Sequence, residues 1–134
     1  MALLALLRLA HITDDREFAQ TADRTLKALS HKIVNQPYAV PQMVVALDYA
    51  IAPKREIVIA GPPSTFLHEL RSRFLPYTIT LVADSTDTRA QLSQLASATA
   101  AMNEINGQPA AYVCQNFACQ LPTTDVSKFV ELLQ

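Results

Sequence analysis

The sequence predicts an α/β fold: a small parallel sheet of about three strands with flanking helices, preceded by a helical hairpin and one further helix. Two observations predict it. Residues 1–53 carry apolar side chains at helical spacing, whereas from residue 54 onward short β-branched runs alternate with helix-length segments. That alternation favours parallel strands joined by right-handed crossovers. We therefore expect two domains, a helical segment over residues 1–53 and a C-terminal α/β module over residues 54–134.

The composition is that of a folded chain without a strongly charged surface. Of the 134 residues, 50% are hydrophobic and 17% are charged, so a core is expected and disorder is not. The formal net charge of −1 gives no electrostatic footprint for nucleic acid or an anionic membrane, and neither is expected as a partner. No motif in the sequence predicts a cofactor.

The first helix is expected over Ala2–Ile12, where Arg8 is the one charged residue of an otherwise apolar run. Such a helix is normally buried on all sides. A signal peptide is disfavoured because the charged stretch Asp14–Glu17 follows where small cleavage-site residues are needed. The run is also shorter than the ~20 residues of a membrane span. Since two cysteines are too few for a disulfide scaffold, we expect a cytoplasmic location with both thiols reduced.

Two further helices complete the helical segment. Thr13 or Asp14 can cap a helix over Asp15–Asn35. Pro41 suits the first turn of the third helix, which ends before Pro53. Their apolar stripes are expected at Phe18, Ala22, Leu26, Leu29 and Ile33, and at Val44, Leu47 and Ile51.

The α/β module alternates strands and helices. Ser64 or Thr65 can cap the helix after the first strand, and Thr124 or Asp125 can cap the last helix. Strands are expected over Glu56–Ala60, Thr78–Val82 and Ala111–Cys114, with a turn at Asn106–Gly107. The helices between and after them carry apolar faces at Phe66, Leu67, Leu70 and Phe74, then at Leu92, Leu95, Thr99 and Met102, and finally at Val126, Phe129, Val130 and Leu133.

Polar and thiol side chains follow the expected strands. In an open parallel sheet, ligands bind beyond the carboxyl ends of the strands. We therefore expect Ser64, Asp84, Cys114 and Asn116 to form a ligand-binding edge. The segment Gly61–Ser64 stands where a phosphate loop would, but its two prolines remove backbone donors, so a rigid turn is favoured over nucleotide binding.

No metal site is predicted. The three histidines, His11, His31 and His68, fall on different helices without metal-ligand spacing, and surface or capping positions are favoured for each. Asp84 and Asp87 are explained by helix capping at least as well as by a pair of catalytic carboxylates.

The two cysteines, Cys114 and Cys119, allow three interpretations. If Gln115 and Asn116 form a tight hairpin turn, the two sulfurs do not face each other. If residues 115–118 form a wider loop, the cysteines close it and a redox role or a disulfide becomes possible. Otherwise both are buried thiols that behave as small apolar residues, which is the favoured interpretation. Asn116 suits the left-handed backbone conformation of a turn in any of these cases.

Several segments, in order, resemble one family. They are LLRLAHITDDREF, PQMVVALDYAIAP, REIVIAG, RFLP and NGQPAAYVCQNFACQLPTTD. Together they resemble the C-terminal end of the thioredoxin-domain-containing family of bacterial YyaL-like proteins and spermatogenesis-associated protein 20. The resemblance implies a parent protein with an N-terminal thioredoxin-like domain, then an α/α toroid of the six-hairpin glycosidase kind, then a small α/β module. The terminal motif comprises Tyr112, Cys114, Asn116, Phe117, Cys119 and Pro122.

The resemblance implies that residues 1–53 are the remnant of the toroid and that the catalytic parts of the parent protein are absent. We therefore expect a truncated, non-catalytic structural or interaction module. It would associate through Ala2–Ile12 and the neighbouring helices, either as a homo-oligomer or with the missing parts of its parent protein. The alternative is a ligand-binding or redox site at the strand ends, or a part of a carbohydrate-processing enzyme.

Overall fold

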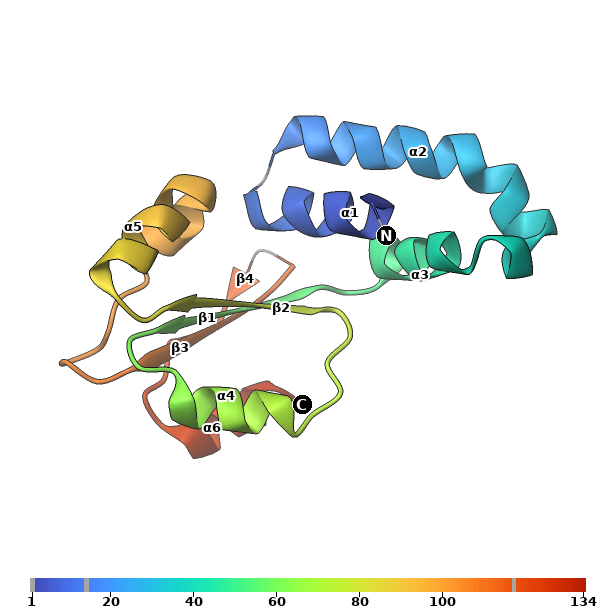
Figure 1. The fold of residues 1–134 in the computed structure, drawn as a ribbon. Helices are drawn as coiled ribbons and strands as arrows, with labels where there is room; N and C mark the ends of the chain where they lie inside the picture. The colour runs from blue at the N-terminus through green and yellow to red at the C-terminus, as the bar shows by residue number, and fades with distance from the viewer. Residues whose placement is uncertain (1, 14, 117) are drawn as a thin grey trace. The chain divides into compact units, whose positions relative to one another are not determined.

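A computed structural model describes residues 2–13, 15–116 and 118–134 (Figure 1). The chain divides into two compact units, Met1–Ala52 and Pro53–Gln134, and each is described by itself. Of the helices in the described ranges, none is both long enough and apolar enough to cross a membrane.

The first unit is helical. It consists of α1 (Ala2–Thr13), α2 (Arg16–Asn35), the short 3-10 helix η1 (Pro37–Ala39) and α3 (Pro41–Ile51). Asp15 caps α2, because its Oδ1 accepts a hydrogen bond from the Glu17 backbone N–H at 2.7 Å. The cap was therefore expected too early, by two residues at Thr13 or by one at Asp14, and Asp14 lies outside the described residues. The core of the unit comprises Leu3, Ala22 and Ala46, packed by Leu4, Leu6, Leu7, Leu26 and Met43.

Three expectations for this unit are wrong. α1 is not buried on all sides: Leu3 and His11 are buried, but Leu9 is 42% exposed. His11 is thus a buried residue and not the surface or capping residue that was expected. α3 turns a different face inward, because Ala46 and Tyr49 are buried while Ile51 is 76% exposed. The Tyr49 ring also lies beneath the Arg8 guanidinium, 5.6 Å from its centroid.

The second unit is a mixed sheet with helices on both sides. Its strands are β1 (Arg55–Ala60), β2 (Thr78–Ala83), β3 (Ala110–Gln115) and β4 (Ala118–Cys119), in the order β2-β1-β3-β4. Its helices are α4 (Ser64–Arg71), α5 (Thr86–Leu95), the 3-10 helix η2 (Ser97–Ala101) and α6 (Val126–Leu132). The α/β class with preceding helices is confirmed.

The expectation of an all-parallel sheet is wrong, because β1 and β2 are parallel while β3 runs antiparallel to β1. Ala83, which ends β2, and Ala110, which begins β3, both pair with Ala60 at the carboxyl end of β1. The connection through α5 and η2 therefore leaves and re-enters the sheet at the same end, where β1 finishes. The expected turn at Asn106–Gly107 is confirmed, with both residues at positive φ between the paired Ile105 and Gln108.

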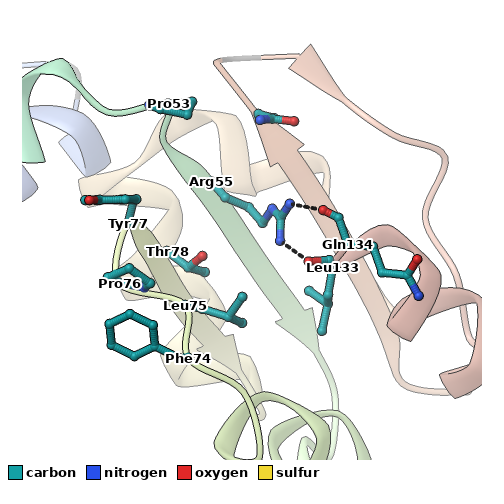
Figure 2. Close-up of a pocket in the computed structure, with 10 residues that line it drawn as sticks. Pro53, Arg55, Phe74, Leu75, Pro76, Tyr77, Thr78, Leu133 and Gln134 are labelled. Carbon is teal, nitrogen blue, oxygen red and sulfur yellow. Dashed lines mark hydrogen bonds between the residues drawn. The ribbon is translucent and has the colours of Figure 1, made fainter.

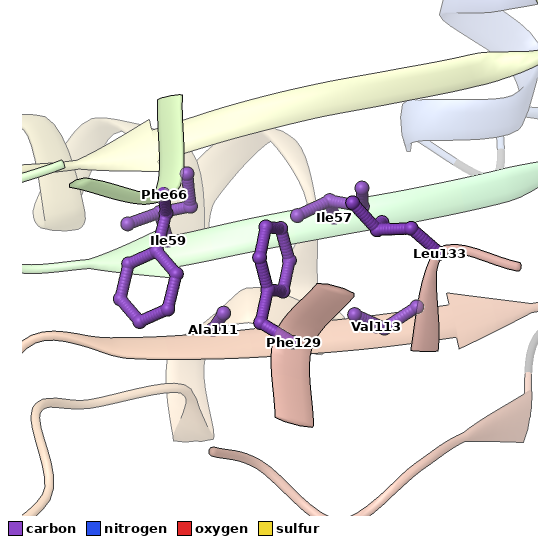
Figure 3. Packing of buried hydrophobic residues seen from close by; sticks show 7 residues of the cluster. All are labelled: Ile57, Ile59, Phe66, Ala111, Val113, Phe129 and Leu133. Atoms are coloured by element: carbon purple, nitrogen blue, oxygen red, sulfur yellow. The ribbon is translucent and has the colours of Figure 1, made fainter. Parts of the chain in front are cut away.

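The main core lies between the sheet and the pair α4 and α6, which share one face of the sheet (Figure 3). The Phe66 and Phe129 rings meet edge to face, with centroids 5.1 Å apart and an interplanar angle of 77°. The buried members of this cluster are Ile57, Ile59, Phe66, Ala111, Val113, Phe129 and Leu133. Odd-numbered residues of β1 and β3 thus face α4 and α6, and even-numbered residues face the other side.

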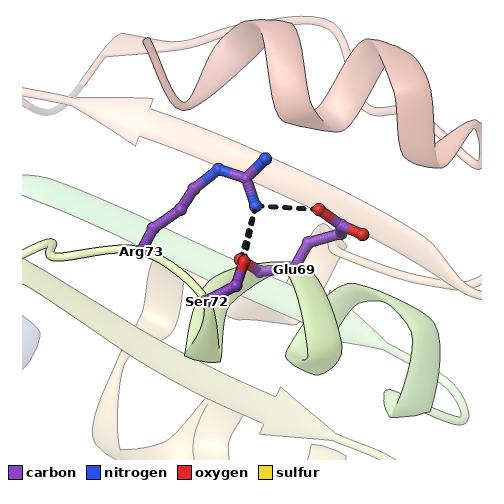
Figure 4. Close-up of polar contacts among 3 residues, drawn as sticks. All are labelled: Glu69, Ser72 and Arg73. Atoms are coloured by element: carbon purple, nitrogen blue, oxygen red, sulfur yellow. Dashed lines mark hydrogen bonds and ion pairs between the residues drawn. The ribbon is translucent and has the colours of Figure 1, made fainter.

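Two helices end earlier than expected. α4 ends at Arg71, and Arg73 closes it by donating from Nη1 to the Glu69 carboxylate at 2.8 Å and to the Ser72 hydroxyl at 3.2 Å (Figure 4). Phe74, expected on the inner face of this helix, is consequently 91% exposed. α5 ends at Leu95, so that Leu95 is exposed too. Ser64 is the first residue of α4 and makes no capping hydrogen bond.

Asp125, one of the two residues expected to cap the last helix, caps α6. It accepts hydrogen bonds from the Ser127 and Lys128 backbone N–H groups at 2.7 and 3.4 Å. We expect Asp125→Ala to lower the free energy of unfolding by about 1 kcal/mol, because it leaves two backbone donors without this acceptor. Urea unfolding followed by circular dichroism measures the loss. Asp125→Asn keeps a capping oxygen and should restore most of it; an equal loss in both variants would contradict the capping role.

Candidate functional site

The reversal of β3 separates the four side chains that were expected at one edge. Ser64 and Asp84 follow the carboxyl ends of β1 and β2, whereas Cys114 pairs with Glu56 near the start of β1, and Asn116 follows it. Because β1 has six residues, the two ends are about 17 Å apart. The expectation of a single ligand-binding edge is therefore wrong, and ligand binding at either end stays a prediction.

The first end is polar and exposed. After β1, Gly61 adopts the left-handed φ of 88°, which glycine takes readily. The rigid turn expected over Gly61–Ser64 stays a prediction. Asp84 accepts a hydrogen bond from the Thr88 hydroxyl at 3.0 Å at the start of α5, where Ser85 and Thr88 form a capping box. A cavity of about 300 Å³ is lined by Ser64, Thr65, His68, Glu69 and Val126. Over the described ranges, no group of three side chains is arranged to hold a metal ion.

A second cavity, of about 260 Å³, lies at the opposite end, beside the first residues of β1 and β2 (Figure 2). Arg55 lines this cavity, and its guanidinium donates from Nη1 to the Leu133 carbonyl at 2.7 Å and from Nη2 to the Gln134 carbonyl at 3.5 Å. These contacts tie the end of the chain to β1. The arginine thus has a structural task.

The cysteines form a disulfide at this second end. Cys114 on β3 stands directly opposite Cys119 on β4, with Cα atoms 3.9 Å apart, and Gln115 stands opposite Ala118. The hairpin therefore turns one residue later than at Gln115–Asn116, and Asn116 has the expected left-handed conformation with φ 50°. Phe117 lies outside the described residues.

The expectations of two buried thiols and of reduced cysteines are both overturned by this disulfide. The physical reason is the register of the hairpin. Directly opposite side chains of an antiparallel pair point to the same face, with Cβ atoms about 5 Å apart, so two cysteines at such positions are within bonding reach. Only Cys114 is buried, at 2% exposure, whereas Cys119 is exposed.

The disulfide belongs to a row of side chains that crosses the sheet on the face opposite α4 and α6. In the register of the strands, Ile79 pairs with Glu56, Glu56 with Cys114 and Cys114 with Cys119. Burial raises the pKa of Glu56 above its ordinary value of 4.5. The register thus pairs a glutamate whose pKa is raised by burial with the buried cysteine of the disulfide.

Sequence analysis did not single out Glu56. The available signal was a lone carboxylate inside a short β-branched run, Glu56–Ala60, of the kind found in buried strands. Its position beside Cys114 depends on the antiparallel register of β1 and β3, which the sequence pattern did not predict.

The raised pKa predicts a pH-dependent stability. A carboxyl group whose pKa is higher in the folded state stabilises the fold below its ordinary pKa, and this contribution is lost as the pH rises through the raised value. We therefore expect Glu56→Gln to be more stable than the wild type at neutral pH and to lose this advantage near pH ~4. Thermal unfolding at both pH values measures it. Exposed Glu131, changed to Gln, is the control; an advantage of Glu56→Gln that is equal at both pH values would contradict the prediction.

Two other residues of the terminal motif have identifiable surroundings. The Tyr112 hydroxyl donates to the Asn103 carbonyl at 2.7 Å and accepts from the Asn103 backbone N–H at 3.1 Å, which fixes the loop before β3. Pro122 lines a cavity of about 450 Å³ together with Gln120, Leu121, Thr123, Lys128, Glu131 and Leu132.

Fold and site together define a small mixed α/β unit with a hairpin disulfide, accompanied by a three-helix unit. The chain is similar to human spermatogenesis-associated protein 20, with 29% identity over 133 residues, which cover 96% of this chain and 17% of that protein. It is 28% identical to the rat protein of the same name, with the same coverage. It is 30% identical to Uncharacterized protein B0495.5 of Caenorhabditis elegans over 95% of this chain and 18% of that protein.

The resemblance found in the sequence is thus confirmed: the chain matches a segment of the spermatogenesis-associated protein 20 family. It spans less than a fifth of the length of these relatives. No family model matches the chain. No solved structure matches it either.

Proposed function

We propose that this chain is a non-catalytic structural or interaction module of a longer protein. The observation that carries the proposal is coverage: 96% of the chain matches only 17% of human spermatogenesis-associated protein 20, so the same segment is embedded in a much longer chain there. In this proposal the longer protein is thioredoxin-domain-containing and six-hairpin-glycosidase-like. The helical unit would end its toroid, and the α/β unit would be its C-terminal module.

The helical unit carries the surface for this association. The leucines of Ala2–Ile12 contribute mainly to the unit's own core, so the neighbouring helices supply most of the exposed apolar side chains. Val34 and Ile51 are each 76% exposed, and Tyr38 is 98% exposed. Val34 and Tyr38 lie close together in sequence, at the end of α2 and in η1, while Ile51 ends α3. Exposed apolar side chains mark protein–protein contacts where they form a contiguous patch. The proposed occupant is the rest of the longer protein, and for the isolated chain it is a second copy.

Light scattering coupled to size-exclusion chromatography tests the proposal. We expect the isolated chain to have a mass of at least twice the 14.7 kDa of one copy. Val34→Ser with Ile51→Ser should shift it towards the single-copy mass, because polar side chains weaken an apolar contact. Phe74→Ser, which changes an exposed aromatic residue of the other unit, is the control and should leave the mass unchanged. A single-copy mass at every concentration would refute the proposal.

A second candidate function, thiol–disulfide exchange at Cys114–Cys119, is favoured by the disulfide itself and by the exposure of Cys119. In the cytoplasm, which is the location we propose, disulfides in proteins are usually transient and catalytic or redox-sensing. Attack of an incoming thiolate at Cys119, the exposed residue of the pair, would make the buried Cys114 sulfur the leaving group. If the function is correct, a dithiol reduces the bond in the folded protein. Reduction only after unfolding would remove this candidate.

A further inference from the structure

Glu56 and Cys114 are partners in the β1–β3 register, and their side chains lie on the same face of the sheet. Directly opposite residues of an antiparallel pair have Cβ atoms about 5 Å apart. A glutamate side chain is long enough to bring its carboxyl group to a sulfur at that separation. Cys114 is 2% exposed, so water has little access to its sulfur.

We propose that Glu56 transfers the proton that Cys114 gains and loses when the Cys114–Cys119 disulfide is exchanged with a dithiol. The proposal rests on the second candidate function, thiol–disulfide exchange. A thiolate that departs into a buried site is destabilised by desolvation, and a neighbouring carboxylic acid removes this cost by protonating it. The burial that raises the pKa of Glu56 keeps that acid protonated to higher pH than an exposed glutamate.

The reaction is balanced in two steps. In the first, a thiolate of the dithiol attacks the exposed Cys119 Sγ, the Sγ–Sγ bond breaks, and Cys114 leaves with the electron pair and takes the proton from Glu56. In the second, the other thiol of the reagent, as a thiolate, attacks the reagent sulfur in the mixed disulfide and releases Cys119, which takes a proton from water. Glu56 then regains its proton from water. The protein has gained two electrons and two protons, and the dithiol has become a disulfide and released two protons to water. In the reverse direction, Glu56 as a carboxylate removes the proton from Cys114.

Other ionisable residues lie on the segments next to Glu56, among them Tyr77, which precedes the first residue of β2. Lys54 precedes β1 by one residue, and its carbonyl accepts from the Asn116 backbone N–H at 3.2 Å. The Tyr112 hydroxyl is engaged with the Asn103 backbone. Arg89 lies on α5, which contacts β2. Ile79, on the other side of Glu56 in the row, is apolar. Glu56 is therefore the carboxyl group that the register places beside the leaving sulfur.

The test compares the rate at which dithiothreitol reduces the native disulfide in the wild type, Glu56→Gln, Glu56→Asp and the control Glu131→Gln. Free thiols are counted by alkylation and mass spectrometry. At pH values below the pKa of Glu56, we expect Glu56→Gln to be reduced about tenfold more slowly than the wild type. This factor is smaller than the usual contribution of a general acid, because the amide of glutamine still donates a hydrogen bond. Glu56→Asp should recover part of the rate, and Glu131→Gln should match the wild type.

The pH profile separates proton transfer from a merely structural effect. The thiolate fraction of the reagent is the same for both proteins at each pH and cancels in the ratio of their rates. The ratio of wild type to Glu56→Gln should fall towards one as the pH rises through the pKa of Glu56, because the acid form disappears. If the wild type is readily reduced but the ratio is near one at every pH, the role of Glu56 is overturned and thiol–disulfide exchange is not. A wild-type disulfide that resists the dithiol in the folded protein overturns exchange and the role of Glu56 together.

Discussion

Replacing Phe129 by alanine should lower the free energy of unfolding of the α/β unit by about 3–5 kcal/mol. Phe129 is fully buried between α6 and the sheet, where its ring meets Phe66 edge to face at 5.1 Å. The substitution removes the transfer free energy of the ring and the aromatic contact, and it leaves a cavity in the centre of the main core. That loss is a large fraction of the total stability of an ordinary domain.

Urea unfolding followed by circular dichroism measures this effect, with Phe74→Ala as the matched control. Phe74 is the same residue type in the same unit but is 91% exposed, so its removal should change the stability by less than about 0.5 kcal/mol. Similar losses in the two variants would contradict the position assigned to Phe129 and the early end of α4.

Opening the disulfide should lower the stability by about 2 kcal/mol. The bond joins residues five apart in sequence, and closing so short a loop restricts the unfolded chain only moderately. Cys119→Ser isolates this effect, because the new hydroxyl lies at an exposed position. Cys114→Ser should cost about 1–3 kcal/mol more, since its hydroxyl enters a site of 2% exposure.

The comparison that checks this is the unfolding of the oxidised wild type, the reduced wild type and the two serine variants. Reduced wild type and Cys119→Ser should agree within about 0.5 kcal/mol, because both lose the same constraint. An unchanged stability on reduction would contradict the effect assigned to the bond. Equal losses in the two serine variants would contradict the burial of Cys114.

The elements with a local chemical signal were predictable from the sequence. Pro41 begins α3, Asp125 caps α6 and the Asn106–Gly107 pair makes a tight turn, as their residue types favour. In each case a side chain or ring determines the backbone conformation over a few residues, and no distant contact is needed. The α/β class follows from the same local patterns.

The candidate site depends on non-local information. The direction of β3 is decided by the path of α5 and η2, and periodicity within each element is the same for either direction. The hairpin shows what a shift of the turn by one residue does to the pairing. Turning after Gln115 and not after Cys114 brings Cys114 opposite Cys119, because a shift of one residue changes every partner in a ladder. Glu56 enters the site only through that register.

Native alkylation followed by intact mass measurement tests the disulfide on which this site depends. Cells are lysed in a thiol-blocking reagent, and the folded protein is then treated with a dithiol and a second reagent of different mass. We expect no label from the first reagent and two from the second, because the bond is closed until the dithiol opens it. Two labels from the first reagent would show two free thiols, and would contradict the disulfide between Cys114 and Cys119.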